Sequence, residues 1–268
     1  MPSKKPRVAI VSLTSCEGCQ FTLFDLGEKF LNFLKRVKIE EFRLIEDEIG
    51  IEEEIKKNKS VPKDKIQYDF SFVEGNPIIE EDLKILKELR MRSKKLIVLG
   101  NCAALGGIPE IKNYQNKEKT IRYVYKNLEG IANPEIKEID NFVKVDLAIP
   151  GCPIDGEEFL RIANDLLVGK LIKIPQRPVC YECQLKEYEC LLQKKELCLG
   201  PIILGGCQAI CLKSKMSCFG CRGILAGAKS EKLLNLIKKQ RSKEDLEEAL
   251  EIFGIKDELE DILGRDRE

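Results

Sequence analysis

Apolar residues in the first part of the chain follow two alternating patterns. Four short runs have the continuous hydrophobicity of strands that are buried or half-buried in a sheet: 8–13, 70–73, 96–99 and 142–149. Three longer stretches place apolar residues along one side of a helix: 21–33, 79–91 and 157–167. Because strand and helix alternate, the pattern predicts an α/β fold with a parallel sheet and helices on both faces. The charged segment 36–65 gives no clear assignment.

The character of the chain changes after about Leu171. Eight cysteines crowd into residues 180–221, where Gly-Pro and Gly-Gly turns separate them. This segment has too few apolar residues for an ordinary core, so its order must come from whatever the sulfurs bind. Helical patterning returns after Gly223, and Ser242 with Asp245 forms a capping box before the last apolar stripe. We therefore expect three parts: 1–168, 169–228 and a helical tail, 229–268.

Charge and composition exclude several classes of function. Among the 268 residues, 45 Lys and Arg balance 45 Asp and Glu, so nothing in the charge favours a nucleic acid or an anionic membrane as a partner. The chain has no histidine, which removes Ser-His-Asp and Cys-His catalysis and His-ligated metals. Neither a Gly-x-Gly-x-x-Gly fingerprint nor a P-loop is present, so we expect no nucleotide site. Against these absences stand twelve cysteines.

The cellular compartment decides how twelve cysteines are interpreted. Residues 1–15 hold too short an apolar run for a signal peptide, and no stretch approaches the roughly 18 apolar residues of a membrane span. We therefore expect a cytoplasmic protein, in which clustered thiols usually bind metal. The surplus of Lys, Glu and Ile suggests a thermophile. Because some hyperthermophiles keep intracellular disulfides, six disulfide bonds stay open as an alternative.

The first four cysteines all follow predicted strands. Cys16 and Cys19 come after the run 8–13, Cys102 follows 96–99, and Cys152 follows 142–149. Open α/β sheets place their ligands at the carboxyl ends of their strands, so we expect these four thiols to form one site. Nearby glycines would let the backbone approach a bulky inorganic group and donate N–H bonds to its sulfides. The alternative is four separate buried thiols, since free cysteine is a common core residue.

The other eight thiols are enough for two tetrahedral zinc sites or two [4Fe–4S] clusters: Cys180, Cys183, Cys190, Cys198, Cys207, Cys211, Cys218 and Cys221. A zinc ribbon needs two Cys-x-x-Cys knuckles about 15–20 residues apart. Here the first and last knuckles are farther apart, with four cysteines between them. The spacing favours iron–sulfur only modestly over zinc, and it does not say which four cysteines share a site.

Four segments together resemble the small subunit of [NiFe] hydrogenases. The similarity is to the cytoplasmic branch, which includes the delta subunit of sulfhydrogenase and the gamma-type subunits of coenzyme F420-reducing hydrogenases. It covers about residues 6–223, and the ordered set of twelve cysteines makes it specific. The segments are Leu13-Thr-Ser-Cys-Glu-Gly-Cys-Gln20, Gly100-Asn-Cys-Ala-Ala-Leu-Gly-Gly107, Pro150-Gly-Cys-Pro153 and the run 178–223.

The resemblance implies a flavodoxin-like N-terminal domain, an irregular iron–sulfur C-terminal domain and three [4Fe–4S] clusters. The proximal cluster would be bound by Cys16, Cys19, Cys102 and Cys152. The pattern Cys198-Leu-Gly-Pro201 matches the last distal ligand of the family, which implies a distal cluster on Cys180, Cys183, Cys190 and Cys198. The medial cluster would then take Cys207, Cys211, Cys218 and Cys221. Cys180 stands where the periplasmic branch has histidine and Cys211 where it has proline, and both changes fit three four-iron clusters.

The resemblance also implies a function. The chain would relay electrons between a nickel–iron site, which splits H₂ in a separate large subunit, and a flavin- or iron–sulfur-bearing partner subunit. Two alternatives stay open: a paralogue related to complex I whose partner has lost the nickel site, and a zinc-bound scaffold. The complex I relative has adjacent cysteines in its first motif, so the Cys16/Cys19 spacing argues against it. Glu17 could act near the large subunit or be a solvated loop residue. Glu74, also at a predicted strand end, could support the ligands indirectly, but a turn residue before Gly75 is the simpler interpretation.

Overall fold

The computed structural model describes residues 5–45, 50–51, 66–124, 126–127 and 134–265. The chain divides into two compact units. The first comprises Met1–Gly106 with Ala132–Ile172, and the second comprises Gly107–Ile131 with Lys173–Glu268. The first four cysteines belong to the first unit and the other eight to the second.

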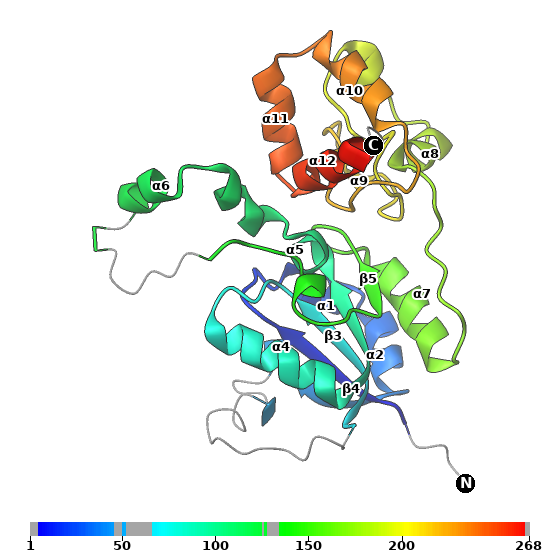
Figure 1. Ribbon diagram of the computed structural model, residues 1–268. Coiled ribbons are helices and arrows are strands. Elements are labelled where there is room, and N and C mark those ends of the chain that lie inside the picture. Colours follow the sequence, from blue (N-terminus) through cyan, green and yellow to red (C-terminus); the bar gives the residue numbers. More distant parts are fainter. Residues whose placement is uncertain (1–4, 46–49, 52–65, 125, 128–133, 266–268) are drawn as a thin grey trace. The chain divides into compact units, whose positions relative to one another are not determined.

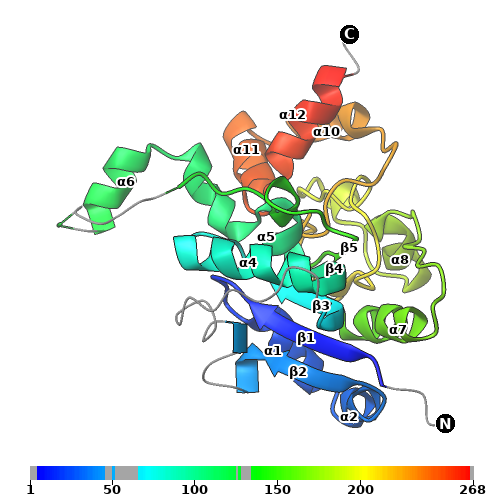
Figure 2. The same ribbon diagram turned by 60° about the horizontal axis from the view of Figure 1, so that its bottom comes forward.

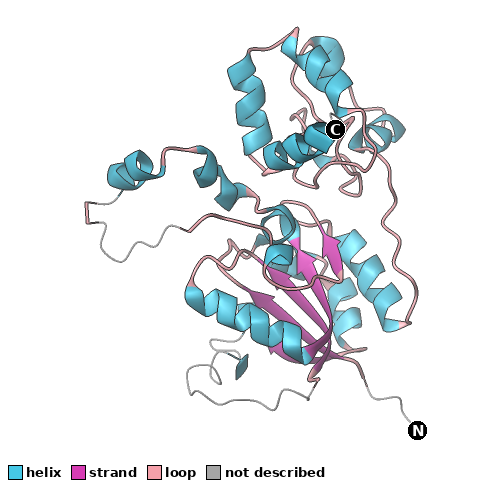
Figure 3. Cartoon of the chain, in the orientation of Figure 1, coloured by secondary structure: helices cyan, strands magenta, loops and turns pink. Residues whose placement is uncertain are grey.

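The first unit is built on a five-stranded parallel sheet (Figure 3). Its strands are β1 (Arg7–Ser12), β2 (Lys38–Phe42), β3 (Tyr68–Glu74), β4 (Ser93–Leu99) and β5 (Leu147–Ile149). They lie in the order β2-β1-β3-β4-β5, and every neighbouring pair is parallel. This is the flavodoxin-like strand order, so the predicted α/β fold is confirmed.

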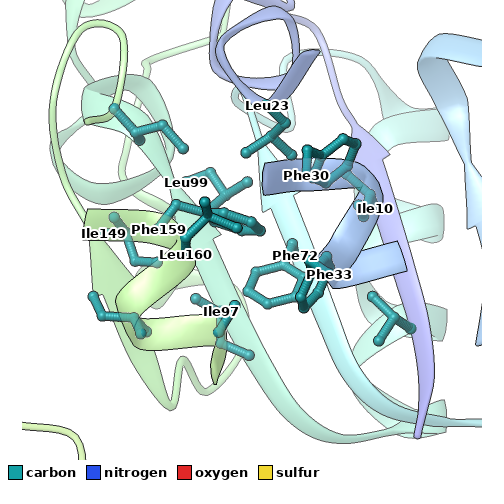
Figure 4. Packing of buried hydrophobic residues seen from close by; sticks show 14 of the residues in the cluster. Ile10, Leu23, Phe30, Phe33, Phe72, Ile97, Leu99, Ile149, Phe159 and Leu160 are labelled. Atoms are coloured by element: carbon teal, nitrogen blue, oxygen red, sulfur yellow. The ribbon is translucent and has the colours of Figure 1, made fainter. Parts of the chain in front are cut away.

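Helices cover both faces of this sheet, as predicted (Figures 1 and 2). On one face lie α1 (Gly18–Asp25), α2 (Glu28–Leu34) and α7 (Gly156–Leu167), and on the other lie α4 (Glu80–Arg92) and α5 (Gly100–Leu105). The first face has a cluster rich in aromatic rings (Figure 4), which includes Ile10, Leu23, Phe30, Phe33, Phe72, Ile97 and Phe159. The second face has its own cluster, which includes Val11, Val73, Ile85, Leu86, Leu89 and Val98. Burial on both faces explains why the central strands appear in the sequence as continuous apolar runs.

The structure departs from the predicted elements at three places. Gly27, with φ +53°, divides the helix predicted over 21–33 into α1 and α2. Strand β2 lies in the unassigned segment 36–65, the rest of which is partly outside the described residues. It is an edge strand, so its charged side chains replace the apolar run expected of a central strand. The strand predicted over 142–149 begins only at Leu147, because the preceding apolar residues pack into the core of the second face instead of extending the ladder.

Short helices and irregular turns make up the second unit. The cysteine-rich segment contains α8 (Val179–Leu185) and α9 (Ile210–Lys213), and the tail contains α10 (Ser230–Lys238), α11 (Lys243–Glu251) and α12 (Ile255–Arg265). The second unit also contains α6 (Lys117–Val124) and the 3₁₀ turns Ile108–Tyr114 and Leu191–Lys194. Two further 3₁₀ turns, Arg43–Ile45 and Ile139–Asn141, belong to the first unit. The side chain of Ser242 accepts a hydrogen bond from the backbone N–H of Asp245 at 3.0 Å, so the predicted N-terminal cap of α11 is confirmed.

The tail supplies much of the core of the second unit. Apolar residues of the cysteine-rich segment, among them Leu199 and Ile203, form one buried cluster with side chains of the tail. The tail residues of this cluster are Leu233, Leu234, Ile237, Leu246, Leu250, Ile255 and Leu259. The cysteine-rich segment therefore does not depend on its sulfurs alone for order. Within the described residues, no helix combines the length and the hydrophobicity that a membrane span requires.

The aromatic cluster of the first face predicts a large stability effect at one position. Phe159 is fully buried, and its ring lies edge-on to Phe72 and Phe33 at centroid distances of 5.1 and 5.9 Å. We expect Phe159→Ala to lower the free energy of unfolding by about 3–5 kcal/mol, because it removes apolar contacts and leaves a cavity. Phe21, which is 56% exposed, is the matched control, and Phe21→Ala should change it by less than about 0.5 kcal/mol. Urea titration of the two variants measures the difference.

Candidate metal centres

The carboxyl ends of the strands in the first unit meet at one edge of the sheet. Ser12 of β1 pairs with Glu74 of β3, Glu74 pairs with Leu99 of β4, and Leu99 pairs with Ile149 of β5. The segments that leave this edge are the ones that carry Cys16, Cys19, Cys102 and Cys152. The register of the sheet thus brings four cysteines from three distant segments to one edge.

Glycines bring the cysteine-bearing turns close together. A Cβ atom on Gly100 would lie 2.5 Å from the Sγ atom of Cys19, and the φ of Gly100 is +86°. The turn of Gly100 is joined to the turn before Cys152, since the N–H of Asn101 donates to the carbonyl of Gly151 at 2.7 Å. These contacts hold the second cysteine of the first motif against the turn that leads to Cys102.

Glu74 holds the backbone of the first motif. This carboxylate is buried at the end of β3, and one of its oxygens accepts the backbone N–H of Cys19 at 3.0 Å. The other oxygen accepts from the amide of Gln20 at 3.2 Å and from the hydroxyl of Ser15 at 3.3 Å. The interpretation of Glu74 as a simple turn residue is therefore wrong. A carboxylate at the end of a buried strand was the signal in the sequence.

Two further side chains shape this edge. The buried Asn76 donates from Nδ2 to the carbonyls of Cys102 and Lys137, at 2.9 and 3.1 Å, and so fixes the segment that carries the third cysteine. Sequence reasoning missed Asn76, because a single amide after a strand resembles any turn residue. Glu17 is half-buried and accepts a hydrogen bond from the hydroxyl of Ser12 at 3.0 Å.

The thiol of Cys19 is in an environment that opposes a lone negative charge. Burial raises its pKa, and the carboxylate of Glu74 raises it further. A thiolate at this position therefore needs a cation to compensate its charge, and metal coordination supplies one. Cys16 and Cys152 are exposed in this chain.

A pocket in the second unit is lined by four cysteines: Cys180, Cys183, Cys190 and Cys198. Its other lining residues are mainly apolar, and Gly200 leaves the space beside the sulfurs open, since a Cβ there would lie 3.5 Å from the Sγ atoms of both Cys180 and Cys198. Burial raises the pKa of Cys180 to about 12, and the charges of the other three thiols contribute. These are the four residues that the resemblance implies for a distal cluster.

The remaining cysteines lie next to this pocket in the fold of the second unit. The carbonyl of Cys218 accepts the N–H of Leu199 at 2.9 Å, and the backbone of Cys218 lowers the pKa of the Cys198 thiol, which burial raises. Burial raises the pKa of Cys218, and the charges of Cys198, Cys221 and Cys207 add to the effect. The charge of Cys211 contributes to raising the pKa of the Cys207 thiol. The structure therefore brings Cys207, Cys218 and Cys221 within electrostatic reach of one another, beside the four-cysteine pocket.

No disulfide bond joins any of the twelve cysteines, all of which lie within the described residues, so the disulfide alternative is wrong. Backbone N–H groups of Gly200, Ala209 and Gly220 lower the pKa of the thiols of Cys198, Cys207 and Cys218 respectively, against the effect of burial. Metal-bound thiolates are oriented and stabilised by such hydrogen bonds. Within the described ranges, no three Cys, Asp or Glu side chains are placed so that they could hold a single metal ion. The chemistry of the donors and the open pocket fit an iron–sulfur group.

Comparison with known proteins identifies the family of the chain. The family described as NADH ubiquinone oxidoreductase, 20 Kd subunit, matches residues 16–166, which is more than half of the chain. The chain is also 36% identical over 221 residues to the sulfhydrogenase 2 subunit delta of Pyrococcus furiosus, covering 81% of this chain and 86% of that protein. The chain belongs to the [NiFe] hydrogenase small subunits of this family. The resemblance carried by the four cysteine segments is thereby confirmed.

Two other members of the family extend the comparison. A subunit of the F420-non-reducing hydrogenase vhu from Methanocaldococcus jannaschii is 32% identical over 260 residues, which cover 86% of this chain and 84% of that protein. Among solved structures, an NAD⁺-reducing [NiFe]-hydrogenase in the H₂-reduced state matches with 25% identity and a TM-score of 0.52, over 64% of this chain and 96% of that chain. The small-subunit fold of this family is thus the fold of the chain.

The contact between Gly100 and Cys19 predicts that position 100 requires glycine. Gly100→Ala should displace the Cys19 sulfur and lower the iron content of the purified protein. Gly169→Ala is the matched control, because Gly169 also has positive φ, +68°, but a Cβ there would meet nothing within 4 Å. Both variants carry similar backbone strain. Equal iron contents in the two variants would contradict the prediction.

Proposed function

We propose that the chain is the electron-transfer subunit of a cytoplasmic [NiFe] hydrogenase and holds three [4Fe–4S] clusters. Cys16, Cys19, Cys102 and Cys152 would hold the proximal cluster. The distal cluster would be held by Cys180, Cys183, Cys190 and Cys198, and the medial one by Cys207, Cys211, Cys218 and Cys221. The observation that carries the proposal is the pocket lined by four cysteines, within a chain of this family.

The described residues suit the transfer of electrons better than acid–base chemistry. Iron–sulfur clusters, when bound, supply one-electron chemistry. The chain itself supplies thiolates, backbone N–H donors to the sulfurs and apolar surroundings that keep water away. The distal and medial quartets adjoin, because the N–H of Leu199, directly after Cys198, donates to the carbonyl of Cys218 at 2.9 Å. This contact supports a relay in which electrons pass between the two quartets without a long gap.

Two partner subunits follow from the proposal. The large subunit would hold the nickel–iron site and cover the sheet edge, where Cys16 and Cys152 are exposed. Phe21, on the helix that begins beside Cys19, is also exposed and could contribute to this interface. A flavin- or iron–sulfur-bearing subunit would exchange electrons with the distal quartet, in which Cys190 is exposed.

A second candidate is an electron-transfer paralogue whose partner lacks nickel. The matching family is described by a subunit of NADH ubiquinone oxidoreductase, and this description supports the second candidate. The two candidates differ in the large chain that purifies with this protein. A chain with two Cys-x-x-Cys motifs and bound nickel supports the hydrogenase, and a chain without them supports the paralogue.

Metal analysis of the native complex tests the cofactor. We expect about twelve iron atoms per copy of this chain, as three four-iron clusters require, together with nickel from the partner. The protein should be brown and should give EPR signals on reduction. A colourless protein with about three zinc ions would show instead that the twelve thiols form zinc sites and have no redox role.

Cys102→Ala tests the proximal quartet. This change removes one of the four sulfurs of the quartet. We therefore expect the variant to lose about one third of its iron, and its rate of H₂-dependent dye reduction to fall about tenfold or more. Ala104→Ser, on the same helix α5, is the matched control and should keep both. If Cys102→Ala retained full activity and iron, the assignment of Cys102 to a cluster would be wrong.

A further inference from the structure

Two charged side chains are buried in the second unit beside the cysteines, yet neither is a metal ligand. Glu182, on α8 between Cys180 and Cys183, is 4% exposed, and Arg222, directly after Cys221, is 2% exposed. Arg and Glu are almost never fully buried unless they are paired, because the loss of water around a charge is costly. Two apolar side chains in place of Arg222 and Glu182 would fill the same space without the cost of removing water from a charge.

The two charges bind opposite ends of one peptide unit. Nε of Arg222 donates to the carbonyl of Gly205 at 3.1 Å, and the N–H of Gly206 donates to Oε1 of Glu182 at 2.8 Å. The same oxygen accepts from Nε and Nη2 of Arg177, at 3.1 and 2.8 Å. A Cβ on Gly205 would lie 3.3 Å from the carboxylate carbon of Glu182, so glycine permits this close approach.

This peptide unit immediately precedes Cys207, so both charges are near its sulfur. Burial raises the pKa of the Cys207 thiol, the positive charge of Arg222 lowers it, and the negative charge of Glu182 raises it. The two side chains therefore act in opposite directions on negative charge at this sulfur. Low exposure keeps water from screening either effect.

We propose that Arg222 and Glu182 set the reduction potential of the cluster held by Cys207, Cys211, Cys218 and Cys221. Reduction adds one electron to the cluster. A buried positive charge favours the reduced form, and a buried negative charge opposes it. Arg222 thus raises the potential, and Glu182, whose charge Arg177 partly offsets, lowers it. The inference rests on the proposed function.

The test replaces each charge by a neutral amide in the complete complex. Arg222→Gln keeps an N–H donor, and Glu182→Gln keeps an acceptor for the N–H of Gly206. Dithionite supplies electrons in a mediated redox titration followed by EPR, and the medial signal is the one that Cys207→Ser alters. At a fixed potential, we expect the ratio of reduced to oxidised cluster to fall about tenfold in Arg222→Gln and to rise in Glu182→Gln. A tenfold change in this ratio corresponds to a shift of about 59 mV in the reduction potential.

Lys213→Gln is the control for burial. Lys213 lies two residues from Cys211 but is exposed, so water should screen its charge and its removal should change the ratio by less than about twofold. Shifts of the same sign in Arg222→Gln and Glu182→Gln, or shifts no larger than that of Lys213→Gln, would overturn the inference and leave the clusters in place. Absence of iron from the parent complex would instead overturn the proposed function.

Arg222→Lys keeps the inference testable if Arg222→Gln fails to assemble. It retains the positive charge but not the geometry of the guanidinium. We therefore expect the ratio of reduced to oxidised cluster to stay within about twofold of the parent value in Arg222→Lys, whereas Glu182→Gln still raises this ratio. A tenfold fall in Arg222→Lys would show that the hydrogen bond to Gly205, and not the charge, sets the potential, and would contradict the proposal.

Discussion

Buried sulfur is the constraint on which the structure depends. Burial raises the pKa of at least six thiols, and neighbouring thiols or carboxylates often raise it further: Cys19, Cys180, Cys183, Cys198, Cys207 and Cys218. Thiolates collected in this way repel one another unless a positively charged group lies between them. Metal binding releases the protons and neutralises the charge, so the stability of both units is linked to the group that the sulfurs hold.

The two units collect their sulfurs by different physical means. In the first, parallel strands end in register, and the loops after β1, β4 and β5 must leave from one edge. The second has almost no regular ladder. There, helices of the tail pack on the cysteine-rich segment and supply the apolar contacts that the segment lacks. A rigid sheet defines the first site, and a small shared core defines the surroundings of the second.

Buried polar side chains bind the backbone of the cysteine-bearing segments in both units. Glu74 and Asn76 bind the backbone of the cysteine-bearing turns and so fix where the ligands lie. Glu182 and Arg222 also bind backbone, but they bring opposite charges close to Cys207. Protein scaffolds control metal centres by orienting ligands and by placing charge near them. Glu74 does both at Cys19, and Arg222 and Glu182 do both at Cys207.

Local pattern determined the central strands, the helices α4 and α7 and the cap at Ser242, because burial on a sheet and exposure at a helix end leave a direct imprint on residue type. Edge strands leave a weaker one. β2 pairs on one side only, and β5 begins late because the apolar residues before it pack into the core of the second face. The positions of the cysteines relative to the strands predicted that the first four lie at one edge of the sheet. Only the tertiary structure decided that Glu74 holds Cys19 and that Arg222 and Glu182 share a peptide, because such contacts join residues whose separation in the chain carries no information about their distance in space.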